Sequence, residues 1–350
     1  MDHLKPSIIL DLGSGYIKAG TAESEFPSCS IPTRIFSSNE EEDPVYPIEH
    51  GIIQNYEHIE TLIGQIYDNE LNLRPEEHPV LLTQPPKNPQ KDKEKLAEIL
   101  FENFQAPALY EEVHSVLTFY ASGKSAGLIL ESGHGLTSVV PILSGYAISE
   151  AILRLDVGGG EIDKYLANFV NEKQPDNPIT NEEARILKEN LCYVPEESNF
   201  NHRDAMEESY RLPDGRTITL EKERQIATNP LFDPSLVDQY DAPGIHEMIF
   251  QSIFKCGVDL RRDFANNIIL SGGNTMFSGL DVRLKHELES RVPPSMTIHI
   301  IADPDRKVYV WRGGSILASL STFIKNICLS RQEYEEFGAS ILRKKFINGL

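Results

Sequence analysis

Short apolar runs that end in glycine clusters recur at three places along the chain. A run of this kind is typical of a buried strand followed by a tight turn. The runs are residues 8–10, 128–130 and 268–270, and the clusters after them are residues 11–15, 131–135 and 271–273. Apolar residues recur with helical spacing over residues 59–71, 91–104, 181–191, 246–262 and 280–291. Strands that alternate with helices predict α/β lobes rather than a helical bundle or a β-sandwich.

The first two glycine clusters match each other. Each has the pattern acid-x-Gly-x-Gly, beginning at Asp11 and Glu131, and each is followed by strand-like residues, 16–21 and 136–142. This repetition predicts a duplicated β-hairpin. A further hairpin is predicted around the turn at residues 212–215, and loops are predicted at 37–47 and 195–203. Because no low-complexity linker divides the chain, we expect packed domains with the chain crossing between them more than once.

Composition limits the classes of protein to consider. A chain of 350 residues with 40% hydrophobic content is long enough for two domains. Its net charge of −20 argues against a nucleic-acid groove or an anionic membrane as partner and favours basic protein surfaces. The four cysteines lie far apart, which indicates neither a zinc site nor a disulfide framework and favours a reducing compartment. We expect no secretion signal and no membrane span.

The glycine clusters also suggest phosphate chemistry. A turn without Cβ atoms lets backbone N–H groups approach phosphate oxygens, and two such turns facing each other would form a clamp. Asp11 and Glu131 could hold Mg²⁺ through its water shell, and Lys18 could offset phosphate charge. For a single G-x-G the better interpretation is a plain tight turn, but two matched copies and a third cluster shift the balance. Neither a Walker loop nor G-x-G-x-x-G after a strand occurs.

At these residues the chain resembles actin and the actin-related proteins, from the first strand to near the C-terminus. The matching segments are DLGSGYIKAG at 11–20, YPIEHGI at 46–52, EEHPVLLT at 76–83, YASG at 120–123, AILRLD at 151–156, SGG at 271–273 and GGSILASLSTF at 313–323. The resemblance implies an α/β, actin-like ATPase-domain fold: two RNase H-like lobes around a nucleotide cleft, shared with Hsp70-type chaperones and sugar kinases. It implies subdomain 1 at residues 1–27, 46–121 and 309–350, a reduced subdomain 2 at 28–45, subdomain 3 at 122–157 and 241–308, and subdomain 4 at 158–240.

The resemblance further implies ATP or ADP as ligand, with Mg²⁺ or Ca²⁺ held through water by Asp11 and Glu131. The implied phosphate-binding positions are Gly13, Ser14, Gly15, Lys18, Ser132, Gly133, His134 and Gly135. The implied ribose- and adenine-binding positions are Gly159, Arg185, Lys188, Glu189, Gly272, Gly273, Met276, Phe277 and Lys307. From the residues alone, Lys188 and Glu189 are equally well explained as solvated helix residues, and Phe277 as core.

Three positions that support hydrolysis in the family are substituted here. His114 stands in place of a glutamine, Glu131 in place of an aspartate and Ser138 in place of a histidine. His134 also replaces an acidic residue and Leu12 a polar one. Because misplacing a catalytic water by about 1 Å costs roughly a hundredfold in rate, these changes predict slow or absent ATPase activity with nucleotide binding retained.

Two departures bear on self-assembly. Residues 28–45 form only a short acidic stretch where actins carry a small subdomain that contacts the next protomer, and the apolar plug position falls at the half-polar residues 236–239, which include Asp238. Burying that carboxylate in a filament without a partner would be costly, so we expect impaired polymerisation. At the opposite end an amphipathic helix of a partner could dock in a groove, or about half of the residues concerned are ordinary core. The groove residues are Tyr120, Tyr146, Leu317, Leu320 and Phe323.

Three functions follow as hypotheses. The favoured one is a nucleotide-stabilised actin-related subunit of a cytoskeletal or other multiprotein assembly, or a filament cap, with actin or other subunits as partners. It binds neither nucleic acid directly nor membrane, and it is cytoplasmic, with the nucleus as the alternative compartment. The second is a divergent actin that polymerises and hydrolyses ATP. The third, more remote, is a phosphotransferase on the same clamp.

Overall fold

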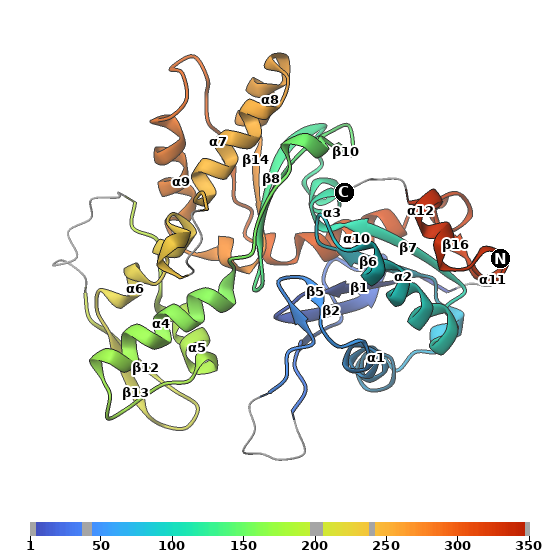
Figure 1. The fold of residues 1–350 in the computed structure, drawn as a ribbon, viewed down its shortest axis with the longest axis horizontal. Coiled ribbons are helices and arrows are strands. Elements are labelled where there is room, and N and C mark those ends of the chain that lie inside the picture. The colour runs from blue at the N-terminus through green and yellow to red at the C-terminus, as the bar shows by residue number, and fades with distance from the viewer. Residues whose placement is uncertain (1–4, 37–43, 197–205, 238–241, 347–350) are drawn as a thin grey trace. The chain divides into compact units, whose positions relative to one another are not determined.

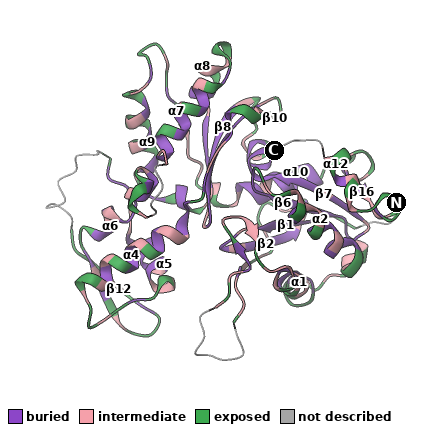
Figure 2. Ribbon diagram, in the orientation of Figure 1, coloured by how far each residue is buried: buried purple, intermediate pink, exposed green. Residues whose placement is uncertain are grey.

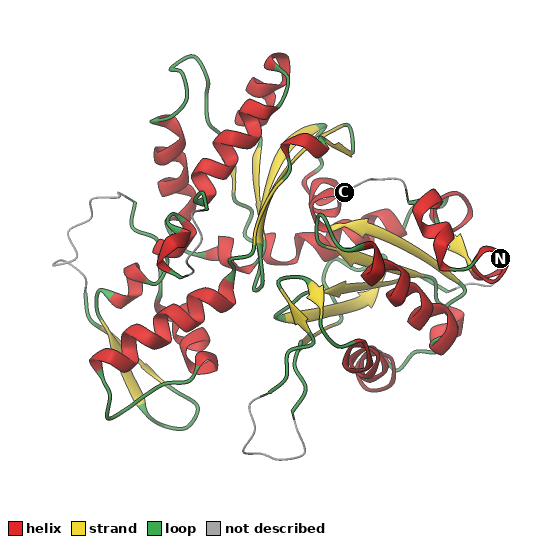
Figure 3. Cartoon of the chain, viewed as in Figure 1, coloured by secondary structure: helices red, strands yellow, loops and turns green. Residues whose placement is uncertain are grey.

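The computed structural model describes residues 5–36, 44–196, 206–237 and 242–346. The chain divides into two compact units (Figure 1). Unit 1 comprises Met1–Ser125, Ile142–Ser149 and Val308–Leu350, and unit 2 comprises Ala126–Pro141 and Glu150–Lys307. Helices and strands occur together in each unit, which confirms the α/β class (Figure 3). The chain passes from one unit to the other more than once, as predicted.

Unit 1 is built on a six-stranded sheet with the order β16-β7-β6-β1-β2-β3. At its centre β1 (Ile8–Leu12) pairs antiparallel with β2 (Tyr16–Thr21) and parallel with β6 (Val80–Gln84). The remaining strands are β7 (Ala108–Val113), parallel to β6, and the edge strands β3 (Cys29–Pro32) and β16 (Leu329–Ser330). Every residue of β1 is buried, because helices cover both faces of the sheet (Figure 2).

Alternate residues of β1 enter two separate cores of unit 1. Ile8 and Leu10 pack with apolar residues of α1 (Tyr56–Gln65) and α2 (Gln90–Glu98). Ile9, between them, packs with residues of α3 (His114–Ser122) and α10 (Tyr309–Ala318). The β1–β2 turn therefore rests on a strand that is anchored on both sides.

Helix α10 lies very close to α3. A Cβ atom on Gly313 would come within 1.8 Å of the Leu117 carbonyl oxygen, so only glycine fits at this crossing. Trp311, two residues earlier in α10, is fully buried. This contact gives a structural reason for the paired glycines that open the segment at residues 313–323.

The predicted helices form, with one correction. Helix α1 and the π-helical turn after it (Ile66–Leu71) extend over the expected region, as do α2 and its π-helical turn (Ile99–Asn103). The expectation of one helix over residues 246–262 is wrong. Helix α7 (Ile245–Lys255) ends because Cys256 adopts an extended conformation, and α8 (Arg261–Ala265) begins after a 3₁₀ turn (Val258–Leu260).

The second sheet has the order β10-β9-β8-β14-β15, and most of its strands belong to unit 2. Strand β14 (Ile268–Ser271) runs parallel to β8 (Ala126–Ser132) and to β15 (Ile300–Ile301). Strand β9 (Thr137–Leu143) lies beside β8, so the second predicted hairpin forms like the first. The short strands β10 (Tyr146–Ala147) and β11 (Leu153–Leu155) pair antiparallel with β9.

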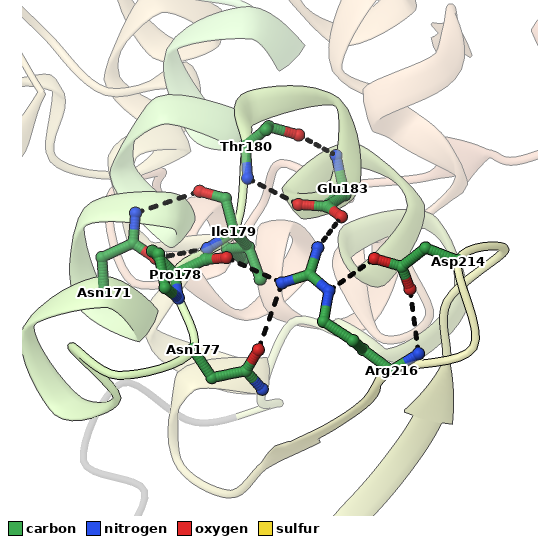
Figure 4. A network of polar contacts seen from close by, with 8 residues as sticks. All are labelled: Asn171, Asn177, Pro178, Ile179, Thr180, Glu183, Asp214 and Arg216. Atoms are coloured by element: carbon green, nitrogen blue, oxygen red, sulfur yellow. Dashed lines mark hydrogen bonds and ion pairs between the residues drawn. The ribbon is translucent and has the colours of Figure 1, made fainter.

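Further helices of unit 2 are α4 (Gly159–Lys173), α5 (Asn181–Leu191), α6 (Glu223–Ile226) and α9 (Leu280–Glu289). The predicted hairpin is present as β12 (Glu208–Arg211) and β13 (Thr217–Leu220). Arg216 ties its turn to the start of α5, because it donates to the Pro178 carbonyl at 2.8 Å and also contacts Asp214 and Glu183 (Figure 4). Glu183 completes a capping box with Thr180.

Some sequence predictions concern residues outside the described part of the chain. These are residues 37–43 of the reduced subdomain 2, residues 197–203 of a predicted loop, and Asp238 and Gln239 of the plug position. The division into four subdomains stays a prediction. Among the described residues, no helix combines the length and the apolar character needed to cross a bilayer.

Candidate functional site

A hydrogen-bonded carboxylate lies under the β1–β2 turn of unit 1. Asp11 is buried, and Lys18, its partner in the strand register, donates to its Oδ2 at 2.8 Å. Thr83 on β6 donates to the other oxygen at 2.8 Å. Burial by itself raises the pKa of a carboxyl, but Lys18 and the nearby His114 outweigh it and lower the pKa of Asp11 below its ordinary value. Asp11 is therefore ionised at neutral pH.

The backbone of the same turn is held from its carbonyl side. Thr33 donates its hydroxyl to the Gly13 carbonyl at 2.6 Å and its N–H to the Gly15 carbonyl at 3.0 Å. Gly51 N–H donates to Ser14 Oγ at 3.0 Å. Within the described part of the chain, the N–H groups of Ser14 and Gly15 donate to no protein acceptor. Two consecutive N–H groups that lack a protein acceptor are suited to bind an anion.

The matching turn of unit 2, between β8 and β9, is braced in a similar way. Ser132 Oγ lies 2.8 Å from Thr137 Oγ1, which donates to the Val157 carbonyl. Asn274, just after β14, donates to the Gly133 carbonyl at 2.9 Å. Two N–H groups at the start of α4 also bind this turn. Gly159 N–H donates to the Gly133 carbonyl, and Gly160 N–H donates to the His134 carbonyl. The turn is thus fixed to both α4 and β14.

Gly272 allows the close approach of β14 to this turn. Its φ of 91° lies in the left-handed region, and a Cβ there would come within 2.3 Å of the Ser132 carbonyl oxygen. The SGG segment at residues 271–273 therefore brings the end of β14 against the backbone of the second glycine turn.

The three substituted hydrolysis positions have different surroundings. His114 begins α3, and its Nε2 lies 3.1 Å from Thr83 Oγ1 and 3.7 Å from Asp11 Oδ1, so it joins the Asp11 cluster. Glu131, at the carboxyl end of β8, is buried to 8% exposure. Ser138 lies within β9 with no exposed surface, and its hydroxyl has no hydrogen-bond partner in the described structure.

A buried lysine lies beside the second turn. Lys188 on α5 donates to the Gly159 carbonyl at 2.9 Å and pairs with Asp163 Oδ1 on α4 at 2.7 Å. Burial raises the pKa of Asp163 to about 6, although Lys188 acts in the opposite direction. The interpretation of Lys188 as a solvated helix residue is wrong, whereas Glu189 next to it is exposed and pairs with Arg185 at 3.4 Å.

A model of the family described as Actin matches this chain over residues 3–186 and 180–347. The two matches together span nearly its whole length. The chain belongs to the actin family. Its mixed α/β structure with a sheet in each lobe is accordingly the actin-like ATPase fold. Members of the actin family in general bind a nucleotide and a divalent cation.

The remaining predicted nucleotide positions are Lys307 and residues that follow β14. Gly273 and Met276 are exposed on a 3₁₀ turn (Gly273–Met276), while Phe277 is buried. Lys307 is exposed, next to Arg306, which donates to the Thr275 carbonyl at 2.7 Å and so holds this turn. These residues lie in unit 2 with the second glycine turn.

The predicted groove residues, all in unit 1, divide into two groups. Tyr120, Tyr146 and Leu320 are exposed, by 39%, 73% and 49%. Leu317 and Phe323 are instead buried in the core beneath α10. The alternative that about half of these residues are core therefore describes Leu317 and Phe323.

Sequence reasoning missed several residues that position the site. Thr33, Asn274 and Asp163 were not singled out, although they hold the first turn, the second turn and Lys188. Thr33 lies 20 residues from the carbonyl it contacts, and Asn274 lies 141 residues from its own. No periodic pattern connects positions so far apart. The only local signal was the proximity of Asn274 to the SGG segment.

Proposed function

We propose that this actin-family protein binds Mg-ATP or Mg-ADP and acts as a structural subunit of a protein assembly rather than as an active ATPase. The main supporting observation is the β1–β2 turn. There the N–H groups of Ser14 and Gly15 have no acceptor among the described protein residues, and Lys18 of β2 pairs with Asp11. Phosphate oxygens would satisfy these donors.

The residues present fit a divalent cation that is held with the phosphates. Asp11 is ionised and is the carboxylate of unit 1 proposed for this role, and Glu131 is the penultimate residue of β8 in unit 2. Among the described residues, no three His, Cys, Asp or Glu side chains group to hold a metal ion unaided. Mg²⁺ keeps several waters and is commonly bound by one or two carboxylates together with substrate phosphates. When bound, it would neutralise phosphate charge.

Weak or absent hydrolysis is supported by the substituted positions. The His114 ring contacts Thr83 Oγ1, and Ser138 is enclosed within β9. An imidazole held against a buried threonine places its nitrogen differently from a glutamine amide, and Ser138 has no surface to offer a water. Nucleotide binding can be retained while hydrolysis is lost, because the backbone N–H donors of the turn do not depend on these side chains.

A role in an assembly is supported by the surface of unit 1. Tyr120, Tyr146 and Leu320 expose apolar area where a partner's amphipathic helix could dock. Within residues 28–45, the predicted reduced subdomain 2, Ile35 and Val45 form an isolated β-bridge. We propose actin or other subunits of a complex as partners, in the cytoplasm and cytoskeleton, with the nucleus as the alternative compartment.

Equilibrium binding of a fluorescent ATP analogue with Mg²⁺ tests the nucleotide site. We expect saturable binding that Lys18→Ala weakens, while Lys164→Ala, an exposed lysine of α4, leaves it unchanged. Absence of saturable binding by the folded wild-type protein would refute the proposal.

Sedimentation with Mg-ATP tests assembly, with the protein alone and together with conventional actin. We expect the protein alone to stay in the supernatant. Filament formation by the protein alone would contradict a non-polymerising role.

A further inference from the structure

The ammonium group of Lys188 is fixed by two contacts from one face of α4. It pairs with Asp163 Oδ1 at 2.7 Å and donates to the Gly159 carbonyl at 2.9 Å. Gly159 and Asp163 are four residues apart, so both partners lie on the same side of the helix. An ammonium has three N–H donors, and the third has no protein acceptor among the residues that the structure describes.

Both side chains of the pair are almost fully buried. The side chains of Lys188 and Asp163 are only 5% and 4% exposed. A buried ammonium needs a counter-charge, and Asp163 provides it at hydrogen-bonding distance. Removing Asp163 would leave the Gly159 carbonyl as the remaining protein contact, and the flexible lysine chain could then turn in other directions.

We infer that Asp163 is a positioning residue for nucleotide binding, which holds Lys188 so that its third N–H meets an acceptor atom of the bound nucleoside. This inference rests on the proposed nucleotide site. The competing explanation is a purely structural ion pair that joins α4 to α5. The two differ in one respect: a structural pair affects unfolding, whereas a positioning pair affects ligand affinity in the folded protein.

Charged and titratable groups from each neighbouring element face Asp163. His134 of the second turn has its Nδ1 3.9 Å from Asp163 Oδ2, and α5 contributes Arg185, Lys188 and Glu189, with Cys192 just after it. Because the pKa of Asp163 is about 6, the carboxylate is ionised at pH 7.5 and becomes neutral as the pH falls through 6. Nucleotide affinity should decrease over the same range.

The test measures the dissociation constant of a fluorescent ATP analogue with Mg²⁺ from pH 5 to pH 8. Wild type, Asp163→Asn and His134→Asn are compared. We expect Asp163→Asn to bind at least about tenfold more weakly than wild type at pH 7.5, as for a lost hydrogen bond to a charged group. The ratio of the two constants should approach one at pH 5. Titration of the nucleotide phosphates affects both proteins equally and therefore cancels in this ratio. The His134→Asn variant should show the same decrease in affinity as the wild type when the pH falls through 6.

Equal affinity of Asp163→Asn and wild type at pH 7.5, even with a lowered melting temperature, would overturn the inference and leave a structural pair. A constant ratio across the pH range would do the same. If Asp163→Asn does not fold, Lys188→Met removes the contact from the other side and must show the same loss and the same pH step. A wild-type protein that binds no nucleotide refutes the proposed function itself, so the two failures are distinguishable.

Discussion

Glu111 is a buried carboxyl group whose protonation should control the stability of unit 1. It lies on β7, opposite Leu82 of β6, and its side-chain Oε1 has no hydrogen-bond partner within the described structure. Burial raises the pKa of Glu111 to about 8, although the nearby Lys93 acts in the opposite direction. The group is therefore mostly protonated in the folded protein at neutral pH.

The sign of the pH dependence follows from the two states. In the unfolded chain the pKa of Glu111 is near 4.5, so between pH 4.5 and 8 the unfolded state carries fewer protons at this site than the folded state. The free energy of unfolding therefore decreases as the pH rises through this range. With about 1.4 kcal/mol for each pH unit, the full loss above pH 8 is about 5 kcal/mol, and about 3 kcal/mol is lost by pH 7.

Glu111→Gln removes this dependence and keeps the shape of the side chain. We expect its free energy of unfolding to equal that of wild type near pH 5 and to exceed it by about 2–4 kcal/mol at pH 8. Urea titration followed by tryptophan fluorescence is suited to the test, because the single tryptophan, Trp311, is buried in unit 1. Glu49→Gln, at an exposed position of the same unit, is the matched control and should leave the pH profile unchanged.

Two outcomes would refute this reasoning. One is a stability difference between Glu111→Gln and wild type that is the same at pH 5 and pH 8. The other is a variant that is less stable than wild type at pH 8, which would mean that the carboxylate is ionised in the folded protein and has an ion-pair partner. Glu112, the next residue, also has a raised pKa, because it is buried, and it contributes a residual slope common to both proteins.

Further predictions concern catalysis, packing and the first turn. Restoring family residues with His114→Gln and Glu131→Asp should raise the rate of phosphate release from ATP at least tenfold, and an unchanged rate would show that other features limit hydrolysis. Gly313→Ala should lower the melting temperature sharply or prevent folding, because the new Cβ would meet the α3 backbone, whereas Gly64→Ala, with open space in α1, should be neutral or stabilising. Thr33→Val should weaken binding of the fluorescent ATP analogue several-fold without lowering expression, and equal affinity would exclude a role of its hydroxyl in shaping the turn.

The strands and hairpins could be predicted because each depends on a few consecutive residues. A buried apolar run followed by glycine fixed the ends of β1 and β8, and the turn at residues 212–215 fixed the β12–β13 hairpin. The break between α7 and α8 was not predicted, because apolar spacing continues through Cys256, where the backbone becomes extended. Leu317 and Leu320 have the same apolar character in the sequence, but only Leu320 is exposed. That difference depends on which neighbours cover each side chain.

The site illustrates a related limit. Family resemblance identifies positions, but it does not identify which residue supplies a charge after a substitution. The resemblance implies an acidic residue at the position of His134. In this chain the carboxylate beside Lys188 is Asp163 of α4, and Nδ1 of the His134 ring lies 3.9 Å from it. A buried lysine still has its counter-charge, although the turn has lost one. By contrast, Ser138 has no compensating partner in the described structure. Lys188, at the proposed nucleoside contact, thus keeps a counter-charge, whereas Ser138, at a predicted hydrolysis position, has no such replacement. This difference is expected of a protein in which nucleotide binding matters more than ATP turnover.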